Sequence, residues 1–115
     1  MATGTIENNS THVIKCGTDG GWYYRVWSDG VKECWKSDTY TGTIAAGGTG
    51  NKTLTLPSGL FSYAPIVMMS VMATGYQFVS PAYVNASASS IDSYIYNFGT
   101  QAKSSFMVRY YAFGT

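Results

Sequence analysis

The chain has 115 residues and a formal net charge of +1, from seven basic and six acidic side chains. That length suits one domain with one modest core. The charges are spread singly, so there is no basic stripe of the kind that binds nucleic acid. No apolar run approaches the roughly 20 residues that are needed to cross a bilayer, so we expect neither nucleic acid nor membrane insertion.

Low charge and high aromatic content bear on assembly. Charged residues make up 11% of the chain and aromatic residues 16%, whereas an average soluble domain is about 25% charged. A small domain of this composition exposes more apolar surface than a monomer normally keeps in water. The composition therefore favours an oligomer over a monomer.

The beginning of the chain is polar and lacks a secretory signal. Residues 1–11 are rich in Gly, Asn, Ser and Thr, and we interpret them as a linker or shaft-proximal segment before a single domain spanning 12–115. No basic region is followed by an apolar one, so we expect either synthesis in a cytoplasm or an excised piece of a longer chain. A short strand is predicted over 12–16, with Val13 and either Ile14 or Cys16 facing inward.

The run from 22 to 35 predicts one specific β-hairpin. Aromatic and β-branched residues flank Ser28-Asp29-Gly30, and Gly30 can take the left-handed conformation that closes a three-residue loop. A two-residue Asp-Gly turn would pair Arg25 with Cys34, whereas the three-residue loop places Arg25 opposite Glu33. The predicted cross-strand pairs are Tyr23 and Trp35, Arg25 and Glu33, Trp27 and Val31. We interpret the charge pair as structural, a tie to the core or to a neighbouring subunit.

The two cysteines and the single histidine offer no metal-site pattern. Cys16 and Cys34 are too far apart in sequence for a Cys-x-x-Cys pair, and His12 has no nearby acid or nucleophile. We expect two buried free thiols, with one disulfide as the alternative. Neither a metal nor another cofactor is expected.

The remaining elements are read as short strands. A loop over 39–49 precedes a strand over 52–56 that Pro57 stops. The segment 65–73 is apolar at both parities, which predicts a central strand covered on both faces. Short strands over 77–80 and 83–86 are broken by Pro81, and 90–98 and 105–113 form the last pair. Seven to nine short strands predict an all-β fold, an antiparallel β-sandwich or jelly-roll.

Candidate ligand residues are aromatic and amide side chains near predicted loops. Aromatic faces suit sugar rings, amides suit sugar hydroxyls, and loops commonly carry function. The candidates are Tyr76, Gln77, Tyr83, Asn85 and, in the 39–49 loop, Tyr40. The six acids show no spacing that suggests a glycosidase pair, so we do not expect an enzyme.

The spacing Trp-x-Tyr-Arg-x-Trp-x-x-Gly-x-x-Glu-Cys-Trp resembles a motif of phage tail proteins. It is similar to the distal, C-terminal domains of tail-fibre and related tail or baseplate structural proteins of phages and prophages of Gram-positive bacteria. The matching residues are Trp22, Tyr24, Arg25, Trp27, Gly30, Glu33, Cys34 and Trp35. The aromatic run 106–114, which ends in Gly, is similar to the last strand of many such domains.

This resemblance implies a virion protein, usually a homotrimer, whose end domain meets the bacterial surface. It implies no catalytic residue. We therefore expect a fibre head that is made in the host bacterial cytoplasm and attaches the particle to a bacterial surface glycan. A trimerisation cap or capsid decoration module without ligand is the alternative, and a small glycan hydrolase is a more distant one.

Overall fold

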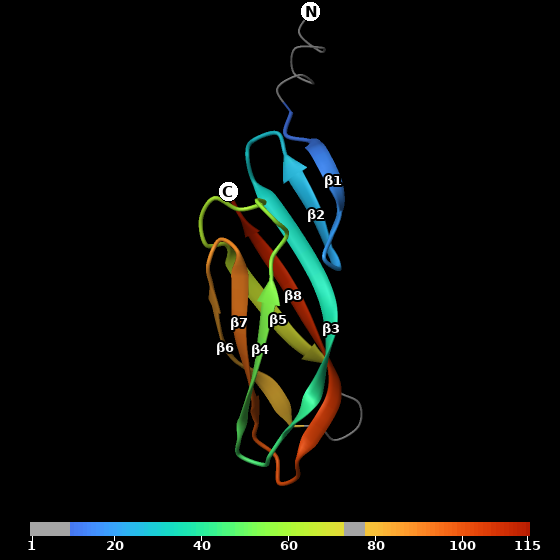
Figure 1. Cartoon of the computed structure of the whole chain (residues 1–115), viewed down its shortest axis with the longest axis vertical. Helices are drawn as coiled ribbons and strands as arrows, with labels where there is room; N and C mark the ends of the chain where they lie inside the picture. The colour runs from blue at the N-terminus through green and yellow to red at the C-terminus, as the bar shows by residue number, and fades with distance from the viewer. Residues whose placement is uncertain (1–9, 73–77) are drawn as a thin grey trace, which may run out of the picture.

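The protein is an antiparallel β-sandwich of two sheets (Figure 1). In this computed structural model, residues 10–72 and 78–115 are described, and they contain eight strands and no helix that could span a membrane. The strands are β1 (Val13–Asp19), β2 (Trp22–Trp27), β3 (Lys32–Ile44), β4 (Thr49–Thr55), β5 (Ile66–Met72), β6 (Val79–Ala86), β7 (Ser90–Asn97) and β8 (Lys103–Gly114). One sheet has the order β1-β2-β3-β8-β5 and the other β4-β7-β6. The predicted all-β sandwich is confirmed.

The core lies where β8 and β7 face each other across the two sheets. Alternate residues of both strands are buried, as expected for strands with one face inward. The large buried side chains include Trp22, Ile44, Leu54, Ile91, Ile95, Phe106, Val108 and Tyr110. The Nε1 of Trp22 donates a 2.8 Å hydrogen bond to the backbone oxygen of Thr55, which joins the first hairpin to the opposite sheet.

The predicted hairpin is confirmed, including its loop and register. The backbone nitrogen of Trp27 donates to the oxygen of Val31 at 2.8 Å, and that of Gly30 donates to Trp27 at 3.0 Å. Gly30 has a φ of 92°, the left-handed conformation that the three-residue loop requires. In the ladder, Arg25 is opposite Glu33 and Tyr23 is opposite Trp35.

Two predictions about apolar strands are wrong. β5 is an edge strand, not a doubly covered central one, and its Ile66 and Met68 are 62% and 57% exposed. β1 is the opposite edge, and Val13, Ile14 and Cys16 are all exposed there. The described chain covers only one face of the five-stranded sheet, and Figure 1 shows β1 and β2 extending beyond the three-stranded sheet.

Loop positions also differ from expectation. β3 continues to Ile44 through an irregularity after Tyr40, so the predicted 39–49 loop shrinks to four residues. β6 is one strand with a register shift next to Pro81, which an edge strand tolerates. Both cysteines are free thiols, but only Cys34 is buried. Of the predicted 1–11 linker, residues 1–9 lie outside the described residues.

Candidate functional site

The aromatic motif of the first hairpin divides between the two faces of the five-stranded sheet. Trp22 is fully buried in the core, and Tyr24 packs against the core from the same inner face. Trp27 and Trp35 are half-buried on the outer face. Only one of the three tryptophans therefore stabilises the sandwich interior directly.

A nearly buried carboxylate stands among the outer-face aromatics. Glu33 is 7% exposed. Its Oε1 accepts a 2.7 Å bond from Arg25 Nε, and its Oε2 accepts a 2.6 Å bond from the Tyr111 hydroxyl. The guanidinium lies 4.8 Å from the ring centre of Trp35 and 5.7 Å from that of Trp27. This cluster satisfies its own charges, in line with the structural role expected for the pair.

The hydroxyl of Tyr111 remains a donor across the physiological range. Burial, followed by the hydrogen bond to Glu33, raises the pKa of Tyr111 to about 12. A protonated phenol can donate to the carboxylate at neutral pH. β8 is therefore tied to the first hairpin through this acid.

The part of this outer face on β8 and β5 carries exposed apolar side chains together with Arg109 and Ser70. β8 and β5 lie side by side in register, so their outward side chains form adjacent rows. The exposed large apolar side chains there are Ile66, Met68, Met72 and Met107, with Tyr23 toward β1. The side chain of Arg109, which is opposite Ser70, has no ion pair or hydrogen bond within the described part of the chain. An apolar face of this extent is typical of an interface.

The outer face of the three-stranded sheet is polar and aromatic. Asp92 Oδ1 accepts hydrogen bonds from Asn51 Nδ2 at 2.7 Å and from the Thr53 hydroxyl at 2.9 Å. Its Oδ2 accepts from the hydroxyl of Tyr94 at 3.1 Å. The hydrogen bonds from Asn51 and Thr53 are the main reason that the pKa of Asp92 is lowered, so its carboxylate is ionised and fixed in orientation.

Two predicted ligand residues adjoin this carboxylate. Tyr83 stacks on Tyr94 with ring centres 4.7 Å apart and planes 2° from parallel, and it is 57% exposed. Asn85 is exposed and lies opposite Asp92 in register. We call this surface the tyrosine platform, comprising Asn51, Thr53, Tyr83, Asn85, Asp92 and Tyr94. A flat aromatic face beside oriented carboxylate and amide groups is the chemistry that binds sugar rings and hydroxyls.

The other predicted ligand residues do not join the tyrosine platform. Tyr40 is on β3 and not in a loop, is half-buried, and stacks on Phe106 with ring centres 5.1 Å apart, so it packs away from the other candidates. Tyr76 and Gln77 lie outside the described residues. Tyr83 and Asn85 are on strand β6, which contains the strand predicted over 83–86.

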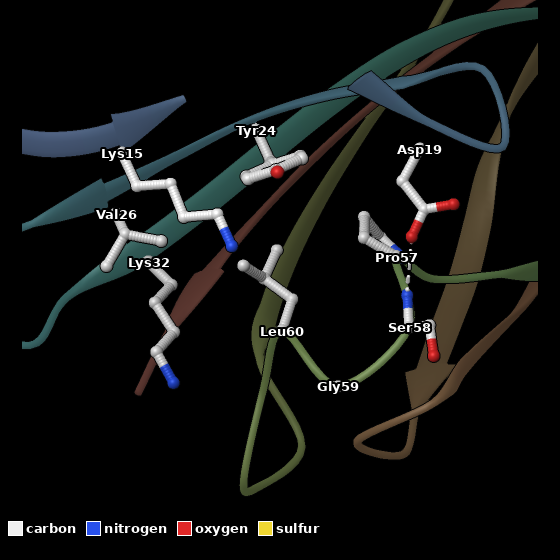
Figure 2. Close-up of a pocket in the computed structure, with 9 residues that line it drawn as sticks. All are labelled: Lys15, Asp19, Tyr24, Val26, Lys32, Pro57, Ser58, Gly59 and Leu60. Carbon is white, nitrogen blue, oxygen red and sulfur yellow. Dashed lines mark hydrogen bonds between the residues drawn. The ribbon is translucent and has the colours of Figure 1, made fainter. Parts of the chain in front are cut away.

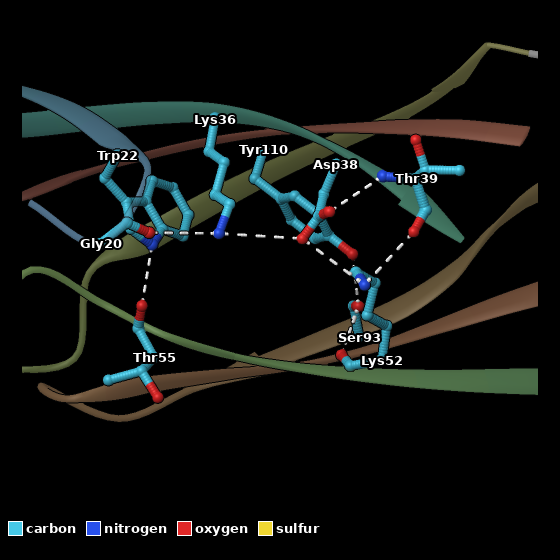
Figure 3. A network of polar contacts seen from close by, with 9 residues as sticks. All are labelled: Gly20, Trp22, Lys36, Asp38, Thr39, Lys52, Thr55, Ser93 and Tyr110. Atoms are coloured by element: carbon cyan, nitrogen blue, oxygen red, sulfur yellow. Dashed lines mark hydrogen bonds and ion pairs between the residues drawn. The ribbon is translucent and has the colours of Figure 1, made fainter. Parts of the chain in front are cut away.

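A second group of charges lies between the sheets (Figure 3). Asp38 is 3.8 Å from the ammonium of Lys36 and 3.5 Å from that of Lys52. Nearby, Ser93 and Tyr110 share a buried 2.8 Å hydrogen bond, and the Ser93 hydroxyl donates to the backbone oxygen of Lys52. These groups satisfy one another and join the sheets. Among residues 10–72 and 78–115, no cluster of side chains could hold a metal ion.

The comparisons with known proteins identify the fold. No family model matches the chain, and no curated protein does. The solved structure of an N-truncated R1-type pyocin tail fibre matches with a TM-score of 0.65 and 19% identity, over 100% of this chain and 97% of that one. The chain has the fold of a pyocin tail-fibre domain.

Longer tail-fibre structures agree. The C-terminal part of the P. aeruginosa R1 pyocin fibre matches with a TM-score of 0.65 and 20% identity, and the chain spans 32% of its length. An N-truncated R2-type pyocin tail fibre matches with a TM-score of 0.59 and 14% identity, over 92% of this chain and 38% of that one. The likeness in fold to these tail fibres covers 92% or more of this chain.

Proposed function

We propose that this chain is the head domain of a tail fibre, in a phage virion or a pyocin-like particle, and that it attaches without catalysis to a saccharide on a bacterial surface. The observation that carries the proposal is the fold likeness, which extends over this whole chain and 97% of a solved pyocin tail fibre. The resemblance of the hairpin motif to phage tail proteins supports the same assignment. Synthesis in the host bacterial cytoplasm goes with it.

The tyrosine platform is the saccharide site in this proposal. Tyr83 offers an exposed ring that Tyr94 holds in place by stacking. Asp92 can accept hydrogen bonds from sugar hydroxyls, and Asn85 can both donate and accept. Asn51 and Thr53 already hold the Asp92 carboxylate in one orientation. Binding therefore costs little side-chain conformational entropy at this residue.

A glycan array with matched variants tests this site. Tyr83→Ala and Asp92→Asn should each weaken binding about tenfold or more. Tyr63→Ala is the control, since Tyr63 is 73% exposed, lies outside the strands and removes the same ring. Parent-like binding by both platform variants would place the saccharide elsewhere.

The outer face of the five-stranded sheet is the subunit interface of a homotrimer in this proposal. A strand residue covers about 16 Å² of sheet plane, so five strands of six to 13 residues present about 700 Å². In a cyclic trimer this face is shared between two neighbours, so each contact is smaller than the roughly 800 Å² per partner of a standard pairwise interface. The Glu33 cluster adds little cost on burial because the acid already has two partners.

Light scattering of the purified chain tests the assembly. A trimer has a mass of about 37 kDa, three times the 12.4 kDa of one chain. Met68→Lys places a charge on the proposed interface and should give a monomer, whereas Thr49→Lys on the other sheet should stay trimeric. A parent that is monomeric at micromolar concentration would rule out the trimer.

The apolar face favours one alternative. A purely structural trimerisation cap or capsid decoration module would use the same interface and bind no ligand. An array without any binding by a well-folded trimer would favour that alternative. Release of reducing ends from a bound glycan would favour the hydrolase instead.

A further inference from the structure

A cleft lies under the part of the five-stranded sheet that extends beyond the three-stranded sheet (Figure 2). Its volume is about 250 Å³, smaller than the 300 to 1,000 Å³ of most drug-sized ligand sites. The lining residues come from β1, β2, the start of β3 and the loop after β4: Lys15, Asp19, Tyr24, Val26, Lys32, Pro57, Ser58, Gly59 and Leu60. We call it the lysine cleft.

Two lysines occupy inward-facing positions in this cleft. In the sheet register, Lys15 and Lys32 flank Val26 from either side, and Val26 packs against the core. Two strand spacings separate their backbones by about 10 Å, and Figure 2 shows both ammonium groups extending into the cleft. Inner-face positions of a sandwich are normally apolar, so two cations in one inner row are unusual.

Neither ammonium is neutralised by the described part of the chain. Within residues 10–72 and 78–115, the side chains of Lys15 and Lys32 make no ion pair and no hydrogen bond. Lys36, the next inward lysine of β3, contacts Asp38 and the backbone oxygen of Gly20. The lysine cleft therefore holds two unpaired positive charges, while comparable inner positions are paired.

The acid of the lysine cleft is engaged elsewhere. Asp19 Oδ2 accepts a 2.9 Å hydrogen bond from the backbone nitrogen of Ser58, which anchors the loop after β4. Figure 2 places Asp19 across the cleft from the two lysines, with Leu60 between them. The lysine end of the cleft thus remains positive.

An aromatic ring completes the lysine cleft. A Cβ added at Gly17 would lie 2.9 Å from the hydroxyl oxygen of Tyr24 and 3.1 Å from its Cζ, so the ring rests directly on the β1 backbone. A side chain at position 17 would collide with this ring. With glycine there, the ring fits against β1 and forms one wall of the cleft.

We propose that the lysine cleft binds an acidic sugar residue, with its carboxylate or phosphate between Lys15 and Lys32 and its ring against Tyr24. Paired ammonium groups favour an anion, and the volume suits one sugar unit. The biological role rests on the proposed attachment to bacterial glycans, but binding of the acid depends on the cleft alone.

Calorimetric titration of the whole chain with four probes tests this inference. The probes are glucuronate, glucose 6-phosphate, glucose and inorganic phosphate. The two sugar acids should bind at least tenfold more tightly than glucose or inorganic phosphate, because only they engage both the lysines and the ring. Raising the salt from about 50 mM to about 500 mM should weaken their binding, since the attraction is screened.

Variants locate the site. Lys15→Gln and Lys32→Gln should each weaken binding of the sugar acids about threefold, and the double variant about tenfold. Lys103→Gln is the control, because Lys103 pairs with Ile44 at the opposite end of the β3–β8 ladder. Far-ultraviolet circular dichroism of each variant should match the parent.

Several results would overturn the inference. They are parent-like binding by the double variant, equal binding of glucose and glucuronate, or inorganic phosphate binding as tightly as glucose 6-phosphate. If the parent binds the array and loses that binding in Tyr83→Ala and Asp92→Asn, but neither sugar acid binds in the titration, the lysine cleft alone would be overturned. Acid binding without any array binding would support the cleft and contradict the proposed attachment.

Discussion

Replacing Arg25 by alanine should destabilise the domain far more than a typical surface substitution. The change removes the only cation that contacts Glu33 among the described residues, and Glu33 is 7% exposed. Loss of contacts to two tryptophan rings adds about 0.5 to 1 kcal/mol each. Leaving the carboxylate with only its Tyr111 hydrogen bond costs a further 1 to 3 kcal/mol or so. Because Arg25 is itself partly exposed, we expect a total of about 2 to 4 kcal/mol.

Denaturant unfolding at fixed chain concentration measures this loss, since the stability of an oligomer depends on concentration. Glu33→Gln and the double variant complete a cycle that isolates the pair, with an expected coupling of about 1 to 2 kcal/mol. Arg109→Ala is the matched control on the same outer face and lacks an acid partner there. An Arg25→Ala variant within about 0.5 kcal/mol of the parent would refute the reasoning.

Three further predictions concern the core and the thiols. Gly50→Ala should cost about 1 to 3 kcal/mol in unfolding experiments, because the new Cβ would lie 2.6 Å from Ile44 Cδ1. Trp22→Phe should cost about 2 kcal/mol by the same measurement, because it removes the 2.8 Å hydrogen bond between the sheets; no loss would mean that this bond contributes nothing. In thiol labelling at pH 8, Cys16 should react and Cys34 should not, since burial and then Glu33 raise the pKa of Cys34 to about 12; equal rates would contradict this.

Local chemistry made the first hairpin predictable. A glycine with positive φ, an Asp that accepts a bond from the backbone of Val31, and opposite charges across the ladder all select one register. β5 was not predictable in the same way. Apolar residues at both odd and even positions of this strand indicate that both of its faces can be buried. They do not indicate whether the burying side chains belong to the same chain.

The candidate site was predictable only in part. Tyr83 and Asn85 could be proposed from residue type alone, whereas Asp92 had no visible partner. Its partner Asn51 is 41 residues away in sequence and reaches it through the β4–β7 ladder. The shared parity of Asp92 and Tyr94 was the available signal for the tyrosine platform. The lysine cleft depends on how far one sheet extends beyond the other, which no local pattern indicates.

Binding to intact bacteria tests the central claim most directly. Fluorescently labelled chain should bind saturably to some members of a panel of Gram-positive and Gram-negative cells. Mild periodate oxidation of the surface saccharides should abolish that binding, and no reducing sugar should appear in the supernatant. Undiminished binding after periodate, or sugar release that follows the added protein, would contradict non-catalytic attachment to a surface saccharide.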